Sequence, residues 1–139
     1  MLSKHFSEIE FLRSKTATIS GINNTWNNAT HKANAIFLCE NYLESIRKFI
    51  QCPINITSGY RSKELNNIIE GASKTSAHQT GEAVDITTSK YSPSELYNKI
   101  REWATLNPNK PIDQLILEPS WVHLGIGLSR SPRRQYFKN

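Results

Sequence analysis

Three side chains whose types suit a divalent metal ion stand in two separate segments of the chain. His78 and Asp85 belong to the polar stretch Ser76-Ala-His-Gln-Thr-Gly-Glu-Ala-Val-Asp85, and His123 follows much later. Two imidazoles and one carboxylate form a donor set that zinc accepts in tetrahedral geometry. Three protein ligands leave the fourth position for water, as in catalytic zinc sites, where the pKa of that water falls to about 7.

Strand periodicity places two of these residues on one face of a predicted sheet. The segments that read as its later strands are 82–88, 112–118 and 121–126. Successive side chains of a strand point to opposite faces. If the main aliphatic side chains pack on helices, then Asp85, His123 and Glu118 all lie on the opposite face. This shared face is a reason, independent of any motif, to group the three residues.

His78 reaches the same place through the loop that precedes the first of these strands. Gly81 lets the chain turn, so that a histidine in the loop can fold back over Asp85. Each residue alone also has an ordinary structural interpretation. A lone histidine is usually a surface or capping residue, and an aspartate in a strand can bond a neighbouring loop. The shared face of Asp85 and His123 favours the metal site.

The elements that must position these residues indicate an α+β fold. Helical spacing or capping patterns predict helices over 7–14, 32–50, 62–70 and from Ser92 to Asn107, and 54–57 reads as a short strand. Helices come first and strands cluster late, which favours an antiparallel sheet. The two-residue link Pro119-Ser120 favours a hairpin between the last two strands.

Length and composition indicate one soluble globular domain over residues 1–139. We expect residues 1–30 to pack on it as an N-terminal extension and 129–139 to form a polar, basic tail. The apolar runs are too short to span a bilayer. Two cysteines, Cys39 and Cys52, make neither a metal motif nor a disulfide framework. The first residues lack the apolar stretch of a secretory signal, so we expect synthesis in the cytoplasm.

Several ordered motifs together resemble the zinc D-Ala-D-Ala carboxypeptidase family. The motifs are Ser76-x-His78-x-x-Gly81-x-Ala83-x-Asp85-Ile86, Trp121-Val-His123-Leu, Ile56-Thr-Ser-Gly-Tyr-Arg61-Ser, Asp113-Gln-Leu-Ile-Leu-Glu118 and Phe6-Ser-x-x-Glu10-Phe-Leu-Arg-Ser. The resemblance runs from near residue 5 to about residue 128. Members share their fold with the hedgehog signalling domain, which implies a small antiparallel sheet with helices packed on one face. They act on peptidoglycan stem peptides.

The resemblance also assigns roles to residues of this chain. His78, Asp85 and His123 match the ligands of one zinc ion. Arg61 matches an arginine that binds substrate carboxylate or polarises the scissile carbonyl, work that suits a guanidinium. Alternatively, Arg61 forms a salt bridge that holds the loop. Ser76 is expected to bond the metal-site loop or the substrate, unless it is an ordinary loop hydroxyl.

The resemblance assigns the general base and the aromatic residue that lines the site less directly. Several relatives carry an acid three residues before the last histidine ligand, where this chain has Ser120. We therefore expect Glu118 to be the base, unless it is a surface carboxylate at a strand end. Trp121 is expected to line the site and bind substrate, with a place in the core as its alternative. The departure at Ser120 keeps open a second function, a catalytically impaired zinc-containing module that binds cell wall or protein.

The expected function is hydrolysis of an amide bond in peptidoglycan stem or cross-link peptides. Cleavage of D-alanyl-D-alanine and of L-alanyl-D-glutamate both remain open. With no signal and no wall-binding domain, we expect a phage or prophage product, either an endolysin that acts after release or an enzyme carried in the particle. The net charge of +5 suits an anionic wall polymer. Nucleic-acid binding is a weaker hypothesis than peptidase function, because no basic helix appears. We expect the protein to be a monomer.

Overall fold

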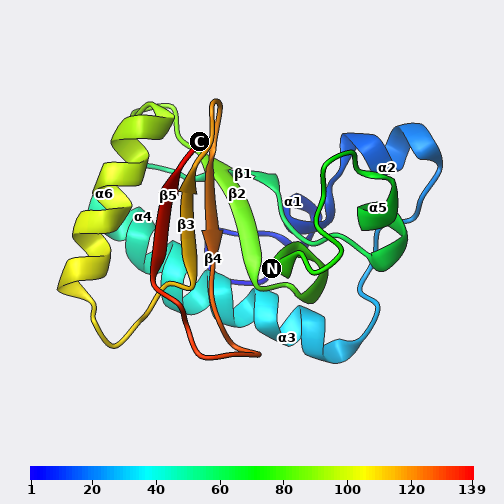
Figure 1. Cartoon of the computed structure of the whole chain (residues 1–139), viewed down its shortest axis with the longest axis horizontal. Helices are drawn as coiled ribbons and strands as arrows, with labels where there is room; N and C mark the ends of the chain where they lie inside the picture. Colours follow the sequence, from blue (N-terminus) through cyan, green and yellow to red (C-terminus); the bar gives the residue numbers. More distant parts are fainter.

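The computed structural model describes residues 1–139 as an α+β fold, in agreement with the sequence-based prediction. Figure 1 shows the sheet nearly edge-on, with α6 on one side of it and α5 on the other. The helices are α1 (Glu8–Leu12), α2 (Lys15–Ser20), α3 (Ala29–Leu38), α4 (Glu44–Ile50), α5 (Lys63–Ile68) and α6 (Pro93–Leu106), with a π-helical segment η1 (Cys39–Leu43) and a 3₁₀ helix η2 (Ala77–Thr80). The strands are β1 (Asn55–Ser58), β2 (Ala83–Thr87), β3 (Gln114–Leu117), β4 (Val122–Gly125) and β5 (Gln135–Lys138).

The five strands form one sheet in the order β1-β2-β4-β3-β5. The pairs β1–β2, β2–β4 and β3–β4 are antiparallel, as the sequence predicted. Glu118 donates its backbone N–H to the carbonyl of Trp121, which closes the expected hairpin around Pro119-Ser120. Strand β5 pairs with β3 in parallel, so the sheet is only mostly antiparallel.

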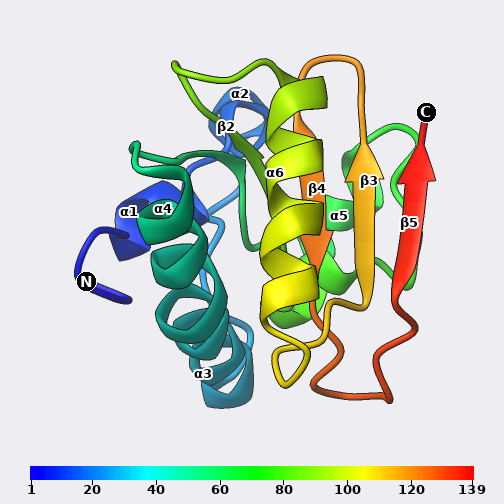
Figure 2. The same cartoon turned by 90° about the vertical axis from the view of Figure 1, so that its left-hand side faces the viewer.

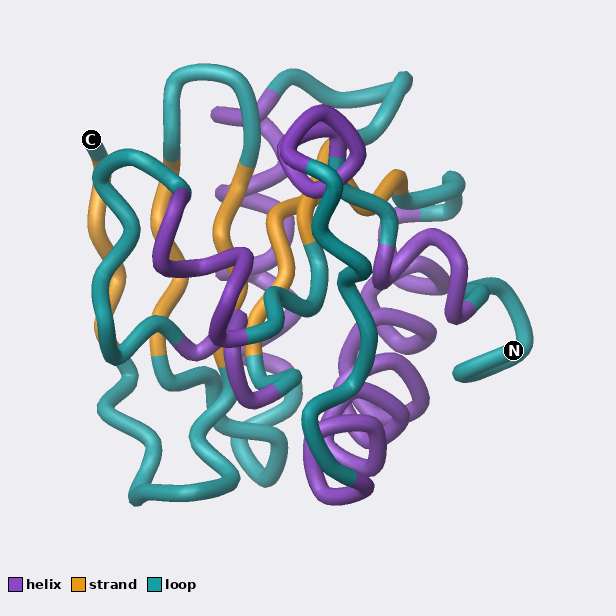
Figure 3. Tube along the Cα trace, turned by 90° about the vertical axis from the view of Figure 1, so that its right-hand side faces the viewer, coloured by secondary structure: helices purple, strands orange, loops and turns teal.

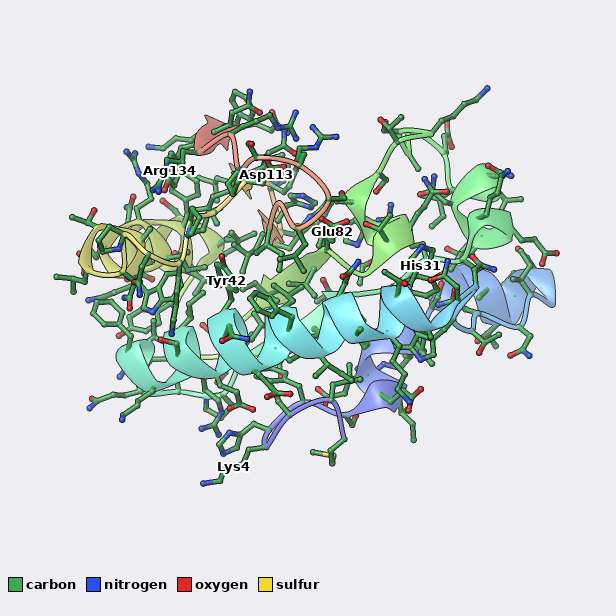
Figure 4. All side chains as sticks on the ribbon, turned by 90° about the horizontal axis from the view of Figure 1, so that it is seen from below. Lys4, His31, Tyr42, Glu82, Asp113 and Arg134 are labelled. Atoms are coloured by element: carbon green, nitrogen blue, oxygen red, sulfur yellow. The ribbon has the colours of Figure 1, made fainter.

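The helix predicted over 32–50 is longer and interrupted by a π-helical turn. It begins at Ala29 because the side chain of Asn28 accepts a hydrogen bond from the backbone of His31. α3, η1 and α4 follow one another without a break, which Figure 4 shows as one long helix. The helix ends at Ile50, and the next residue, Gln51, has a left-handed φ of 54°.

The hydrophobic core lies between the sheet and the helices α3, α4 and α6 (Figure 2). From the sheet, Leu115 and Leu124 are fully buried, and from α6 Trp103 is buried at 1% exposure. The indole of Trp103 donates a hydrogen bond of 2.9 Å to Ser45 Oγ in α4. This packing takes up one face of β2, β3 and β4, and so leaves the other face for the polar residues.

Residues from the N-terminal stretch 1–30 also contribute to the core. Leu2, Phe6 and Phe11 are buried, and the carbonyl of Phe11 accepts a hydrogen bond from the backbone of Tyr60. The short helix α2 was not predicted. It has a serine cap at Ser14 and a left-handed glycine after its last residue, but too few apolar positions to stand out as a helical pattern.

The C-terminal stretch 129–139, predicted as a polar and basic tail, contains strand β5. The strand is only four residues long and lies at the edge of the sheet with no fully buried residue, so its sequence lacks the alternation of a half-buried strand. Tyr136 packs against the core from this edge, and the guanidinium of Arg101 lies 4.9 Å from its ring centre.

Both cysteines are free thiols, and burial raises the pKa of Cys39 well above its usual range. None of the helices has the length and apolar character needed to traverse a bilayer.

Candidate metal centre

The three side chains predicted as metal ligands converge on the sheet face opposite the core. Their candidate ligand atoms all lie within 4.8 Å of one another. The Oδ1 atom of Asp85 is 3.0 Å from His123 Nδ1 and 3.3 Å from His78 Nε2. Asp85 and His123 are direct partners across β2 and β4, which puts their side chains on the same face. The predicted strand periodicity therefore accounts for two of the three residues of the cluster.

The loop between α5 and β2 brings His78 over the sheet, and Figure 3 shows this segment in front of the strands. His78 lies in η2, and its side chain is buried at 3% exposure. Its Nδ1 lies 2.7 Å from the carbonyl oxygen of Gly59. Because a carbonyl oxygen only accepts, Nδ1 must carry the proton. The lone pair of His78 Nε2 then points at Asp85, the arrangement that a metal-binding histidine needs.

The charges of the cluster favour a bound cation. Burial raises the pKa of the Asp85 carboxyl, but the hydrogen bond from His123 and the neighbouring imidazoles outweigh this effect and hold that pKa well below its usual range. Burial lowers the pKa of His78, which keeps the imidazole neutral. A neutral Nε2 lone pair and a carboxylate oxygen at 3.3 Å are two acceptors facing each other. A divalent cation shared between them satisfies both, so the donor set fits zinc.

Gly81 makes the turn that places His78, as the sequence predicted. It has a φ of 78°, and a Cβ atom built there would lie 2.2 Å from the carbonyl oxygen of His31. We expect Gly81→Ala to lower the free energy of unfolding by roughly 2–4 kcal/mol, because left-handed strain adds to overpacking against α3. Urea denaturation monitored by circular dichroism measures this loss.

Gly71 provides a matched control for that substitution. Its φ of 77° is nearly the same, but a Cβ atom there would meet nothing within 4 Å. Gly71→Ala should therefore cost only the backbone strain, roughly 1–2 kcal/mol. Equal losses for the two variants would mean that the close approach to His31 contributes nothing.

The cluster lies in a cleft of about 690 Å³ that is mostly polar. The other residues predicted for the site also line this cleft: Arg61, Ser76, Glu118 and Trp121. The sequence-based set thus comes together in one place, although its members lie on four different stretches of the chain.

Arg61 approaches the cluster from the segment after β1. Its Nη2 is 3.8 Å from Asp85 Oδ2, and its backbone N–H donates to the carbonyl of His78. Burial lowers the pKa of Arg61, while the charge of Asp85 raises it. The Nε atom is buried and has no hydrogen-bond partner. Because the ion pair is long and no hydrogen bond engages Nη1 or Nη2, the guanidinium retains donors for a further acceptor in the cleft.

Ser76 and Trp121 have distinct surroundings. The Oγ atom of Ser76 accepts a hydrogen bond of 3.2 Å from the backbone of His78, so this serine caps η2 and holds the loop. Of its predicted roles, this is the bond to the metal-site loop. Trp121 follows the turn of the β3–β4 hairpin and is half-buried, with part of its surface in the cleft.

Glu118 lies at the same hairpin end of the cleft as Trp121. Ile116 is the direct partner of His123, so Glu118, two residues further on, is its diagonal neighbour, at a typical separation of roughly 7–8 Å. Its Oε1 accepts a hydrogen bond of 2.8 Å from Asn139 Nδ2. No cation pairs with it, in contrast to Asp85 and Asp113.

Two buried carboxylates of the cleft were not assigned a role from the sequence. Glu82 accepts hydrogen bonds from Leu128 and Ser129. Asp113 forms a two-point ion pair with Arg133. The sequence signal that could have indicated a role for Glu82 is its place as an acidic residue in an otherwise mostly apolar strand pattern.

Comparison with known families adds one finding. The model of the family described as Peptidase M15 matches residues 4–124. The match includes every residue assigned to the site so far and ends before β5. No curated protein matches the chain significantly.

Proposed function

Because the chain belongs to the zinc-dependent metallopeptidases of the peptidase M15 family, we propose that it hydrolyses an amide bond in peptidoglycan stem or cross-link peptides. The observation that supports this most directly is the convergence of His78, Asp85 and His123 in the lining of a polar cleft. An open cleft above three ligands leaves room for water and a peptide.

Zinc would be held by His78 Nε2, the Asp85 carboxylate and His123 Nδ1. When bound, zinc lowers the pKa of a coordinated water to about 7 and acts as a Lewis acid towards a carbonyl. Contacts within the chain fix the positions of these side chains. The bond from His78 to Gly59 fixes the tautomer, and pairing across β2 and β4 fixes the positions of Asp85 and His123.

Arg61 is proposed to bind and orient the substrate. A guanidinium donates two parallel hydrogen bonds to a carboxylate, or one to a carbonyl oxygen as negative charge develops on it. The side chain is only 15% exposed, so its charge acts in a partly desolvated place. Such a place strengthens the electrostatic interaction relative to one in water.

Glu118 is proposed to move the proton. Asn139 occupies its Oε1, which leaves Oε2 free to take a proton from the attacking water and return it to the nitrogen of the leaving amine. The other carboxylates of the cleft are less suited. Asp85 belongs to the metal cluster, and Glu82 and Asp113 already accept several hydrogen bonds each.

The two candidate bonds for cleavage are D-alanyl-D-alanine and L-alanyl-D-glutamate. We further propose that the protein meets the wall after release from a cell or as part of a phage particle. Its net charge of +5 would favour contact with an anionic wall polymer.

A single experiment tests the proposed function. Zinc-loaded protein is incubated with purified peptidoglycan, with and without a chelator, and new amino and carboxyl termini are identified by mass spectrometry. We expect chelator-sensitive release of termini at one type of bond. Zinc-loaded protein that sediments with the wall yet releases no termini would instead support a binding module.

A further inference from the structure

The segment between β4 and β5 is held over one end of the cleft by two buried carboxylates. We refer to residues 126–134 as the β4–β5 loop. Glu82, at 3% exposure, provides the first anchor. Its Oε2 accepts hydrogen bonds from the backbone of Leu128 (2.9 Å) and Ser129 (3.1 Å), and its Oε1 accepts one from Ser129 Oγ (2.9 Å). The start of the loop is therefore fixed to the beginning of β2.

Asp113, at 5% exposure, provides the second anchor. Its Oδ1 accepts hydrogen bonds of 2.9 Å from the backbone N–H and Nε of Arg133, and its Oδ2 accepts one of 2.8 Å from Nη2. The hydrogen bond from Arg133 holds the pKa of the Asp113 carboxyl below its usual range, so the pair is charged at neutral pH. Figure 4 labels Glu82 and Asp113 beside the loop.

The loop between the anchors is folded tightly on itself. A Cβ atom at Gly127 would lie 3.1 Å from both the carbonyl oxygen of Arg130 and the Cα atom of Pro132. Arg130 thus lies in a short turn fixed at both ends, and its side chain lines the cleft. A residue on a fixed turn can bind a ligand with little loss of backbone entropy.

Arg130 is the cationic residue of the cleft without a partner. Three arginines line the cleft. Arg133 is paired with Asp113, and Arg61 faces Asp85, whereas Arg130 forms no ion pair. The nearby carboxylates of Glu82 and Asp113 are already occupied by donors from the loop itself. The guanidinium of Arg130 therefore keeps its donors for a ligand.

The strand register places Arg130 across the metal cluster from Glu118. Asp85 pairs with His123 in the middle of β2 and β4. Glu118 lies at the hairpin end of these strands, while the β4–β5 loop begins at their other end, where the backbone of Ile126 donates to the carbonyl of Glu82. A peptide that lies along the cleft would pass the proton-transferring residue, the metal cluster and Arg130 in that order.

We propose that Arg130 is a specificity-determining residue that binds a carboxylate of the substrate peptide. This inference rests on the proposed peptidase function. In a peptide, a carboxylate is the group that matches the fork of a guanidinium in both charge and geometry. The carboxylate would lie on the side of the scissile bond away from Glu118. The β4–β5 loop lies beyond the residues matched by the family model.

Two peptides that differ in one group test the inference. They share one stem-peptide sequence, with a free carboxyl group in one and a carboxamide in the other. We expect the zinc-loaded protein to prefer the acid by about tenfold in kcat/KM, mostly through KM, which corresponds to about 1.4 kcal/mol. In Arg130→Gln the ratio should fall to near one, and the zinc content should stay as in the wild type.

Arg134→Gln is the matched control. Arg134 has the same charge as Arg130 and lies in the same β4–β5 loop. It is outside the cleft lining and donates to the carbonyl of Pro108. This variant should keep the preference for the acid. A preference that persists in Arg130→Gln, or that both variants lose equally, would overturn the inference while leaving the proposed function intact.

A binding measurement separates this inference from the proposed function. Calorimetry of both peptides with zinc-loaded Glu118→Gln, with and without Arg130→Gln, reports recognition without turnover. Tighter binding of the acid that depends on Arg130 supports the inference even if no bond is cut. Equal binding of the two peptides, or no binding, contradicts it.

Discussion

Replacing His123 with alanine is expected to lower peptidase activity by roughly 10³-fold or more and to abolish stoichiometric zinc binding. Two ligands hold zinc much less tightly than three, and Lewis-acid stabilisation is worth several kcal/mol, each 1.36 kcal/mol being a factor of ten in rate. His123 is the most informative of the three ligands to remove. Its side chain is 16% exposed and its one polar partner is Asp85, whereas His78 is buried and also bonds Gly59.

The measurement is zinc content by mass spectrometry after dialysis, together with peptide hydrolysis at fixed added zinc. His5→Ala is a matched control, because His5 is an exposed imidazole paired with Glu44, away from the cleft. It should keep zinc and activity. If His123→Ala retains one zinc with wild-type affinity and an unchanged circular dichroism spectrum, the assigned ligand set is wrong.

The alternation of side chains explains why much of the site could be predicted from the sequence. Asp85 and His123 interrupt aliphatic strands at positions that face away from the core, and the pairing of β2 with β4 makes them direct neighbours. His78 could be added because Gly81 permits the turn before β2. These inferences need only periodicity and backbone sterics, which are local properties of the chain.

The β4–β5 loop and β5 could not be predicted, because they depend on partners distant in sequence. Glu82 binds residues 46 and 47 positions later, and Asp113 binds Arg133, 20 positions later. Nothing in the local pattern of 129–139 indicates that a buried carboxylate will hold it. The edge strand is therefore specified by tertiary contacts, which override weak local preferences.

The capping residues show how local and distant contacts combine at the site. Ser76 caps η2 through a bond to His78 only two residues away, a feature of local sequence. The same η2 residue also bonds Gly59, 19 positions earlier, and this contact sets the tautomer of the imidazole. The position of His78 was thus open to prediction, but the direction of its lone pair was not.

Glu118→Gln is expected to reduce kcat by about 10²–10⁴-fold while leaving KM and zinc content nearly unchanged. General acid–base catalysis contributes an effect of this size, and an amide has the shape of the carboxylate but cannot take the proton. Zinc should be retained because Glu118 is outside the cluster of His78, Asp85 and His123. The measurement is steady-state kinetics on a soluble stem peptide with zinc content determined in parallel.

Glu102→Gln provides the control, since Glu102 is an exposed carboxylate on α6, which packs against the core face of the sheet. It should show wild-type kinetics. If Glu118→Gln keeps zinc and the wild-type kcat, the proton is moved by another group. Glu82 and Asp113 are the remaining carboxylates of the cleft outside the metal cluster, and each would first have to release the loop donors that it binds. Because those bonds hold the β4–β5 loop, such a mechanism would require the loop to move during turnover, whereas proton transfer through Glu118 does not.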